Sequence, residues 1–365
     1  MHPIDLQHFA APIAITGNSP GAYVEYRYFQ TKLNKIRVPP LSNRPPQNPP
    51  ADQEAGGLPR RFLERLAAVM PPDHLAPVVA SFSVPRATGF RINPLRAGER
   101  VFDELTARGF MIRRIDWLPE ANVIAHAQRA DLLRDEAALT GQIYVQNPSS
   151  MIPVSILDPQ AGEKVLDLAA APGSKTIQIA GRMRARGELA AVEIVRKRFF
   201  RLRALLTRHG AEFVQTFLED GRRFSRHHPE YFDRVLLDAP CSTEGRFVAG
   251  DPKTTRYWSE RKIHEMAHRQ KQLAESAVRC LRPGGTLVYS TCTTAPEENE
   301  GVIDWLLERF DGEITVEPVD IPDSVPLPPI RTWKGKTYRP EVAQTIRVAP
   351  DETFEAFFVA KVVKR

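Results

Sequence analysis

The sequence predicts an α/β fold built on a doubly wound parallel sheet, with a small α+β unit before it. From residue 141 to residue 310, short apolar segments of strand character alternate with longer segments of helical periodicity. The first such strand lies in KVLDLAAAPGSKT, residues 164–176, and runs into a turn of small residues and then a helix. Acidic residues recur where the predicted strands end, which is typical of a ligand-binding sheet edge.

The composition is that of a globular protein. The chain has 365 residues, of which 42% are hydrophobic and 26% are charged, and this length allows two domains. The net charge of +6 is weak evidence for a polyanionic partner. No apolar run approaches the roughly 20 residues of a membrane span, and no apolar signal segment follows the start, so we expect a soluble, cytoplasmic protein. Three cysteines are too few for a disulfide framework or a tetrahedral zinc site.

Residues 1–57 form a proline-rich leader. They contain nine prolines, six of them in residues 38–50, and proline sustains neither a helix nor a central strand. We predict that this segment is disordered and adds nothing to the fold. A functional arm is the alternative.

Residues 58–140 are predicted to form a small α+β domain. Apolar residues recur on one helical face in residues 60–69 and again in residues 102–110, and residues 89–93 alternate like a strand. Residues 58–115 carry ten arginines and five acidic residues. Because arginine suits phosphate and base-edge contacts, this domain is a candidate for binding nucleic acid, and a solvated basic surface is the alternative.

Residues 141–365 are predicted to form a second domain in which strands and helices alternate. Helices are expected at residues 174–183, 195–209, 259–281 and 297–310, and strands at residues 165–168, 189–192, 213–216, 232–237 and 286–290. A Pro-Gly-Gly sequence at residues 283–285 is expected to stop the longest helix. Residues 313–316 and 356–363 are strand-like runs separated by a proline-rich loop instead of a helix, so we expect a terminal antiparallel pair.

Acidic side chains end four of the predicted strands: Asp167, Glu193, Asp220 and Asp238. One such residue is ordinary, but four along one sheet edge indicate a site. An acid after the second strand suits the hydroxyls of a ribose. The turn AAAPGSKT lacks both the G-x-G-x-x-G pattern of dinucleotide sites and the G-K-[ST] pattern of P-loops, which favours an adenosine without phosphates. The sequence therefore predicts S-adenosylmethionine as the cofactor.

Two cysteines follow neighbouring strands at that edge, Cys241 in DAPCS and Cys292 in STCT. Burial explains most cysteines, and we accept it for Cys280 on the apolar face of a helix. A thiolate beside a methyl donor can add to carbon 6 of cytosine, which makes carbon 5 nucleophilic enough to take a methyl group. Loss of the carbon-5 proton and of the thiol then restores the ring. Spacing alone does not decide which cysteine is the nucleophile and which assists the elimination.

Several motifs together resemble the Sun/RsmB family of RNA cytosine-5 methyltransferases. They are VLDLAAAPGSKT, LLDAPCS, GGTLVYSTCT followed by PEENE, and the lead-in GQIYVQNPSSM. RINPLR, residues 91–96, looks like the R-[VI]-N signature of that family's small N-terminal RNA-binding domain. The resemblance runs from about residue 58 to the C-terminus. It implies a Rossmann-like class I methyltransferase sheet that methylates carbon 5 of a cytidine in structured RNA, with 16S-type ribosomal RNA as the favoured substrate and tRNA as the alternative.

The resemblance also implies roles for individual residues. Cys292 is the nucleophile, Cys241 assists release of the methylated base, and Glu193 binds the ribose hydroxyls. Asp238 and Lys175 face the target base, where the alternatives are a turn cap for Asp238 and a solvated helix residue for Lys175. The residues implied to contact the cofactor are Ala169, Ala170, Ala171, Pro172, Gly173, Ser174, Lys175, Glu193, Asp220 and Asp238.

The sequence departs from the family's pattern at two places. Thr243 stands where glycine usually follows DAPCS, and EAFF at residues 355–358 replaces the usual D/E-G-F-F. We expect the first to alter the loop on the base side and the second to change only a strand turn. Because the chain ends soon after this strand, we expect no C-terminal RNA-binding extension.

Two further patterns concern partners. HEMAH at residues 264–268 matches the H-E-x-x-H zinc pattern, but no third ligand follows and the helix must pack on the sheet, so we expect no metal. Residues 181–210 carry nine Arg or Lys and two acidic residues, which favours contact with an RNA backbone over a merely solvated helix. We expect a monomeric enzyme that acts on RNA and not at a membrane. A non-catalytic RNA-binding assembly factor is the alternative of another class, disfavoured because no thiol or strand-end acid is missing.

Overall fold

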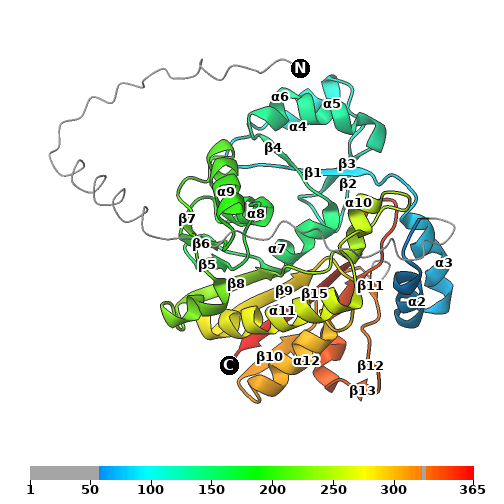
Figure 1. The fold of residues 1–365 in the computed structure, drawn as a ribbon. Helices are drawn as coiled ribbons and strands as arrows, with labels where there is room; N and C mark the ends of the chain where they lie inside the picture. The colour runs from blue at the N-terminus through cyan, green and yellow to red at the C-terminus, as the bar shows by residue number, and fades with distance from the viewer. Residues whose placement is uncertain (1–56, 320, 323–325) are drawn as a thin grey trace, which may run out of the picture. The chain divides into compact units, whose positions relative to one another are not determined.

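A mixed β-sheet positions the site (Figure 1). The computed structural model describes residues 57–319, 321, 322 and 326–365, all of which lie in one unit of the chain, Pro50–Arg365. Five neighbouring strands in this described part are parallel, in the order β9, β8, β5, β6, β7. Their bounds are Lys164–Asp167 (β5), Glu188–Val192 (β6), Gln215–Phe217 (β7), Phe232–Asp238 (β8) and Leu281–Thr291 (β9). The strand order extends outward in both directions from β5, so the predicted doubly wound α/β fold is confirmed.

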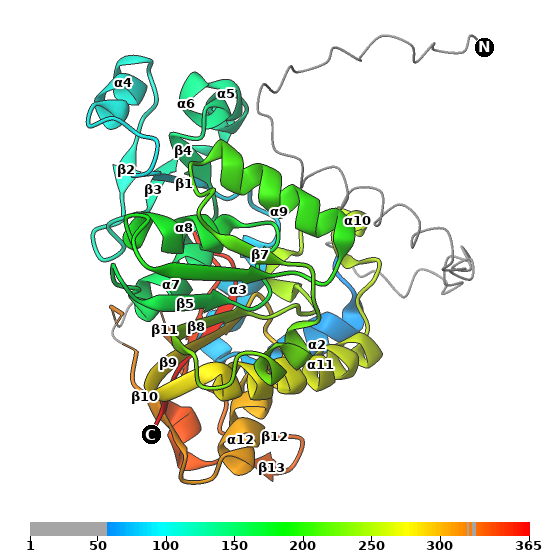
Figure 2. The same ribbon diagram turned by 90° about the vertical axis from the view of Figure 1, so that its left-hand side faces the viewer.

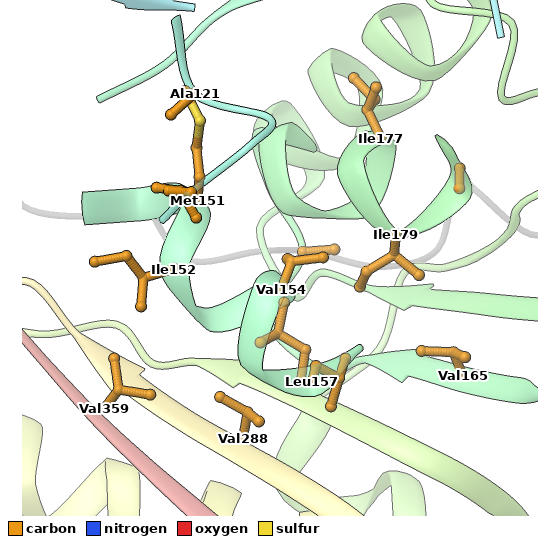
Figure 3. Close-up of a cluster of buried hydrophobic side chains, with 14 of the residues drawn as sticks. Ala121, Met151, Ile152, Val154, Leu157, Val165, Ile177, Ile179, Val288 and Val359 are labelled. Atoms are coloured by element: carbon orange, nitrogen blue, oxygen red, sulfur yellow. The ribbon is translucent and has the colours of Figure 1, made fainter. Parts of the chain in front are cut away.

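Helices cover both faces of this sheet because its strands are apolar on both sides. Val165 packs in the core formed with α7, α8 and α9, whereas the next residue, Leu166, packs in the core formed with α11 and α12. Figure 3 shows Val154 and Ile179 of the first core, above strand residues that include Val165. The helix bounds are Ile152–Leu157 (α7), Ser174–Arg182 (α8), Arg196–Arg208 (α9), Glu260–Cys280 (α11) and Glu300–Arg309 (α12).

Antiparallel strands extend the sheet beyond β9. Strand β15 (Phe357–Lys364) pairs with β9, and β10 (Ile314–Glu317) pairs with β15 on its other side, so the predicted antiparallel pair is confirmed. Short strands that the sequence did not predict continue the sheet, namely β14 (Ile346–Val348) and β11 (Pro326–Leu327). A separate hairpin, also not predicted, joins β12 (Thr332–Trp333) to β13 (Lys336–Thr337).

The longest helix ends before the Pro-Gly-Gly sequence, as predicted, but the strand after it starts earlier than expected. Strand β9 begins directly after α11, and Pro-Gly-Gly lies within it. Leu281 pairs with Phe232, and regular pairing resumes where Thr286 meets Arg234, with a register shift between the two. Shorter elements complete this region: Gly221–Arg226 (η3), Glu244–Arg246 (η4), Pro252–Thr255 (α10) and Pro340–Gln344 (η5).

A second sheet of the described residues has the order β2, β3, β1, β4 and lies beside α8 and α9 (Figure 2). Strand β4, in the lead-in GQIYVQNPSSM, pairs with β1, whereas the sequence predicts that the lead-in belongs to the second domain. The predicted division after residue 140 stays a prediction. The bounds are Thr88–Ile92 (β1), Arg113–Arg114 (β2), Asn122–Ile124 (β3), Ile143–Val145 (β4), Val101–Ala107 (α4), Arg129–Arg134 (α5), Glu136–Leu139 (α6), His126–Gln128 (η1) and Pro148–Met151 (η2).

The first two described helices, α2 (Arg60–Val69) and α3 (Pro72–Ser81), pack in a different core from the small sheet. The Phe62 ring lies 4.9 Å from Phe247 and 6.0 Å from Trp258, both in the segment after β8. Aromatic rings in such edge-on contact anchor the two helices there. Apart from Gly57, the predicted leader lies outside the described residues. Among the helices of the described ranges, none combines the length and the apolarity that a bilayer crossing requires.

Candidate active site

A cavity of about 490 Å³ opens at the carboxyl edge of the parallel strands. Residues after β5, β6, β7, β8 and β9 line it, which is where an open α/β sheet binds ligands. Ten of the twelve site residues named from the sequence line this one cavity: Ala169, Ala171, Pro172, Ser174, Lys175, Glu193, Asp220, Asp238, Cys241 and Cys292.

Ala170 and Gly173 do not line the cavity, but they shape the turn of residues 169–176, which does. Ala170 is buried, and its N–H donates to the last carbonyl of β6 at 2.9 Å. Gly173 precedes α8 with φ of 114°, and a Cβ there would lie 2.9 Å from Leu202 Cδ1, so only glycine suits the position. Asp167 also lies behind the cavity, where it accepts a hydrogen bond of 2.6 Å from Thr176 Oγ1. Burial raises the pKa of Asp167 to about 7.

Each of the two acidic residues at the ends of β6 and β7 has an arginine partner. Glu193 Oε1 accepts from the Val195 N–H at 2.7 Å, and its Oε2 lies 3.3 Å from Arg198 Nη1. Asp220 accepts from the Arg222 guanidinium at 2.6 Å, and this hydrogen bond lowers the pKa of Asp220. The two residues after Glu193 are apolar and 57% and 46% exposed. A carboxylate next to an exposed apolar surface suits a nucleoside, whose ribose is polar and whose base is flat.

Lys175 and Asp238 form an ion pair in the cavity. Lys175 Nζ lies 2.7 Å from Asp238 Oδ2, and the lysine side chain is only 4% exposed, against 32% for the aspartate. Lys175 is therefore not a solvated helix residue. Its Nζ also donates to Ser150 Oγ at 2.6 Å, and Ser290 Oγ donates to the other oxygen of Asp238 at 2.9 Å. These contacts hold both charged groups in a single orientation.

The two cysteine sulfurs meet in the cavity. Cys241 Sγ lies 3.4 Å from Cys292 Sγ. The contact follows from the sheet, because β8 and β9 are parallel neighbours with Asp238 opposite Ser290, and the segments after them leave the same edge. The prediction that both thiols lie at one sheet edge is confirmed.

The surroundings make the two thiols differ in acidity. A hydrogen bond from Cys241 lowers the pKa of Cys292 against the effect of burial, and the positive charge of Arg246 lowers it further. The same hydrogen bond, burial and the negative charge of Glu298 raise the pKa of Cys241 well above its usual value. Cys292 is therefore the better thiolate, and Cys241 is the thiol that donates to it.

Two buried carboxylates hold the segments that carry the thiols, and sequence reasoning missed both roles. Glu244 accepts hydrogen bonds from the N–H and the hydroxyl of Thr294 at 3.0 and 2.6 Å, which ties the segment after β8 to the segment after β9. Glu298 accepts from the Ser242 N–H at 3.0 Å and from Gln270 at 2.8 Å. Burial raises the pKa of Glu298 to about 8. Glu298 lies in PEENE, which served only as a family signature at the sequence level.

Arg246 is a third residue near the thiols that was not predicted. It lines the cavity, and its Nε lies 3.3 Å from Glu355 Oε2. No spacing rule marks it, because the segment that carries it is folded by long-range contacts, such as the 2.9 Å bond from the Gly245 N–H to the Cys292 carbonyl.

The arginine and the asparagine of the R-I-N sequence are buried, and they join the small sheet to the segments around α8 and α9. Arg91 is 2% exposed and donates to the Ser174 carbonyl at 2.6 Å, where α8 begins. Asn93 Nδ2 donates to the carbonyls of Gly141 and His209 at 2.8 and 2.9 Å. The signature therefore stabilises the junction beside the cavity turn.

The H-E-x-x-H residues lie on the exposed side of α11. His264 and His268 are both exposed, and Glu265 lies 3.1 Å from Lys262 and 3.5 Å from Arg269. Within the described ranges no three His, Cys, Asp or Glu side chains are grouped so that they could hold a metal ion.

The comparison with known families agrees with this geometry. The family described as "16S rRNA methyltransferase RsmB/F" matches residues 154–363, which is more than half of the chain and includes almost the whole cavity wall. The chain belongs to the RsmB/F family. This is a family of RNA cytosine-5 methyltransferases, so the resemblance read from the motifs is confirmed.

Relatives in the RsmB/F family carry names that refer to two kinds of RNA. The tRNA (cytosine(49)-C(5))-methyltransferase of Pyrococcus abyssi is 39% identical over 281 residues, 77% of this chain and 89% of that protein. Ribosomal RNA small subunit methyltransferase F of Escherichia coli is 40% identical over 268 residues, 72% of this chain, but this chain spans only 56% of that protein. The crystal structure of a methyltransferase homologue from Pyrococcus horikoshii is 30% identical with a TM-score of 0.69, covering 84% of this chain and 100% of that one.

Proposed function

We propose that this protein transfers a methyl group from S-adenosylmethionine to carbon 5 of a cytidine in structured RNA. The observation that carries the proposal is the 3.4 Å approach of Cys241 Sγ and Cys292 Sγ in a cavity that the AAAPGSKT turn also lines. Family membership supports the reaction class.

The residues after β5, β6 and β7 would hold the cofactor. The cavity volume of about 490 Å³ lies within the range of small-molecule sites. Glu193 suits the ribose hydroxyls, the exposed apolar pair after it suits the adenine, and the turn of residues 169–175 suits the methionine part. The bound cofactor supplies an electrophilic methyl group.

The thiols would activate the base. The Cys292 thiolate would add to carbon 6 of the cytosine, and the electron pair would move to carbon 5, which would take the methyl group as its bond to the sulfonium sulfur breaks. Loss of the carbon-5 proton to solvent would then return an electron pair to the ring and expel the Cys292 sulfur as a thiolate. Cys241 assists this release, because its high pKa keeps it as a thiol that can hydrogen-bond to the departing sulfur.

Lys175 and Asp238 would orient the base. Their ion pair lies in the same cavity as the thiols, and Ser150 and Ser290 hold it in place. Fixed charges of this kind stabilise the charge that develops on the ring when the thiolate adds.

Helix α9 supports RNA as the substrate. Its apolar side, with Phe199, Leu202 and Leu206, is buried, and its other side is basic. Within the described residues, five exposed basic side chains of α9 form no ion pair, and they are Arg196, Lys197, Arg201, Arg203 and Arg208. An unpaired basic face beside the cavity suits a phosphate backbone.

We favour ribosomal RNA of the small subunit as the target, because the family description refers to 16S rRNA. A tRNA is the second candidate, because this chain spans 89% of the archaeal tRNA enzyme and only 56% of the ribosomal RNA enzyme.

The test is a methylation assay on both RNAs. Purified protein is incubated with methyl-labelled S-adenosylmethionine and an unmodified transcript of small-subunit ribosomal RNA or of tRNA. The nucleosides are then separated by mass spectrometry, and the modified position is mapped by bisulfite sequencing. We expect 5-methylcytidine at a defined position in one of the two RNAs. Label on another base, or none on either RNA, contradicts the proposal.

A further inference from the structure

The ten arginines of residues 58–115 differ in what they contact. Hydrogen bonds or ion pairs with other described residues are formed by Arg60, Arg61, Arg65, Arg91, Arg96, Arg108 and Arg113. Arg114 lies over the Phe102 ring at 4.3 Å. The side chains of Arg86 and Arg100 form neither kind of contact within the described residues. Most of the arginines that made this region a candidate for binding nucleic acid therefore interact with other residues of the protein.

Arg86 lines a groove of about 530 Å³ between residues 82–89, the start of α5 and the segment after β8. Its Nε and Nη2 are buried without a hydrogen-bond partner, and its guanidinium carbon lies 6.0 Å from the centre of the Phe82 ring. The Oγ1 of Thr88, which is 2% exposed and lines the same groove, also has no partner. Buried donors without acceptors are costly, so an anion that accepted from them would be stabilised.

The rest of the groove suits a nucleotide. Arg129 adds positive charge on one side. Val84 and Val248 line it as well, and they are apolar and 50% and 43% exposed. The one acidic residue among those that line the groove, Glu355, is paired with Arg246.

The groove adjoins the active cavity. Arg246 lines the cavity, Glu355 lines the groove, and the two side chains are in contact at 3.3 Å. Two residues after Arg246 the chain reaches Val248, in the groove. A polymer that inserts one base into the cavity would therefore carry its next nucleotide over this ion pair and into the groove.

We propose that this groove binds the RNA nucleotide that neighbours the target cytidine, with its phosphate on Arg86 and its base against Val84 and Val248. The proposal rests on the proposed function, and it adds a second RNA contact outside the cavity. A phosphate would supply the acceptors that Arg86 and Thr88 lack. Single-stranded RNA is the form that fits, because its bases are free to lie on an apolar surface.

The test is the salt dependence of RNA binding. The dissociation constant is measured for a short fluorescent single-stranded RNA with one central cytidine, over a series of KCl concentrations, for the wild type and Arg86→Gln. We expect Arg86→Gln to raise Kd about tenfold at low salt. The slope of log Kobs against log salt should become shallower by about 0.7, the loss of one phosphate contact on a single strand. Affinity for S-adenosylmethionine should not change.

Arg100→Gln is the matched control, because it removes the same charge from an exposed arginine outside the groove and the cavity. It should leave Kd and the slope at wild-type values. Equal losses in Arg86→Gln and Arg100→Gln would mean that only diffuse charge attracts the RNA, and would overturn the proposal.

Val84→Glu is a second test that does not depend on how Arg86→Gln folds. Val84 is half exposed, so the substitution places a negative charge in the groove without disturbing a core. We expect weaker RNA binding, and wild-type binding by Val84→Glu would overturn the proposal. The failure of the proposed function is distinguishable, because it would be an absence of 5-methylcytidine with the wild type, whereas these measurements concern binding alone.

Discussion

Cys241 and Cys292 have matching positions in the fold, because each follows one of two neighbouring parallel strands at the same edge of the sheet. Their surroundings differ. The hydrogen bond between the two thiols lowers the pKa of Cys292 and raises the pKa of Cys241. The positive charge of Arg246 lowers the pKa of Cys292 further, whereas burial and the negative charge of Glu298 raise the pKa of Cys241 further. The sheet brings the two sulfurs together, and residues from distant segments add to the difference between their pKa values, which supports Cys292 as the proposed nucleophile.

The clearest way to test this comparison is to remove each thiol in turn. We expect Cys292→Ala to reduce methyl transfer by at least about 10⁴-fold, because no nucleophile remains. Cys241→Ala should still add to the base but fail to release it, so a covalent complex with RNA should accumulate. Methyl transfer is measured with labelled S-adenosylmethionine, and the complex by a shifted band in a denaturing gel.

Cys280→Ala is the control, because Cys280 is buried in α11 away from the cavity. A covalent complex with Cys292→Ala, and none with Cys241→Ala, would reverse the assignment.

A smaller effect is expected from Arg246, whose charge favours the Cys292 thiolate. The pKa of Cys292 lies below its usual value, so the rate should rise with pH at a lower pH than an ordinary thiol allows. Arg246→Gln removes the positive charge, should move this rise to higher pH, and should lower the rate at neutral pH by roughly tenfold. The measurement is the pH profile of kcat/KM.

Glu355→Gln provides the opposite change at the same ion pair. The negative charge of Glu355 raises the pKa of Cys292, so its removal should move the rise in rate to lower pH. Arg246→Lys keeps the charge and should retain most of the activity. If both neutral variants shift the profile in one direction, the effect is a loss of loop structure and not of charge.

The surroundings of Cys241 can be tested through the effect of Glu298 on the stability of the protein. Burial raises its pKa from 4.5 to about 8, so the folded protein binds this proton more tightly than the unfolded chain does. Its contribution to stability is fully present below pH 4.5 and is lost as the pH rises through about 8. Glu298→Gln cannot ionise and should be more stable than the wild type at high pH, by on the order of a few kcal/mol, but not at low pH.

Denaturant unfolding of both proteins at pH 5 and pH 9 measures this difference. Glu99→Gln, at an exposed position, is the control and should follow the wild type. A gap between Glu298→Gln and the wild type that is the same at both pH values would show that Glu298 does not titrate in this range.

The sequence was sufficient for the parts of the fold that depend on local pattern. The period of the apolar residues predicted α2 at its observed bounds and α11 to within one residue at each end. It failed for β14, a three-residue strand whose middle residue, Arg347, is charged. Arg347 is buried together with its partner Glu300 of α12, which lies 2.5 Å away, and no local pattern predicts such a pairing.

The site also has a part that local pattern predicts and a part that depends on long-range contacts. The order of strands and the residues at their ends were enough to predict that Cys241, Cys292 and Asp238 share one edge, whereas Lys175 was assigned to it from the resemblance to the family. Arg246 could not be found in this way, because its position depends on how the segment after β8 folds against the segment after β9. Sequence patterns therefore predict which reactive groups meet, whereas their protonation depends on packing between distant segments.

The smallest expected effect concerns the segment that carries Cys241. Thr243 has φ of 60° and ψ of 29°, a left-handed conformation that a β-branched residue rarely adopts. The strain of about 1–2 kcal/mol should be relieved by Thr243→Gly, and the greater freedom of glycine in the unfolded chain should offset about half of it. We expect a net stabilisation of about 0.5–1 kcal/mol in denaturant unfolding. Gly173→Ala should act in the opposite direction, because it adds a Cβ to a left-handed position that is already in contact with Leu202. If Thr243→Gly is no more stable than the wild type, the hydroxyl or methyl group of Thr243 contributes packing that offsets its strain.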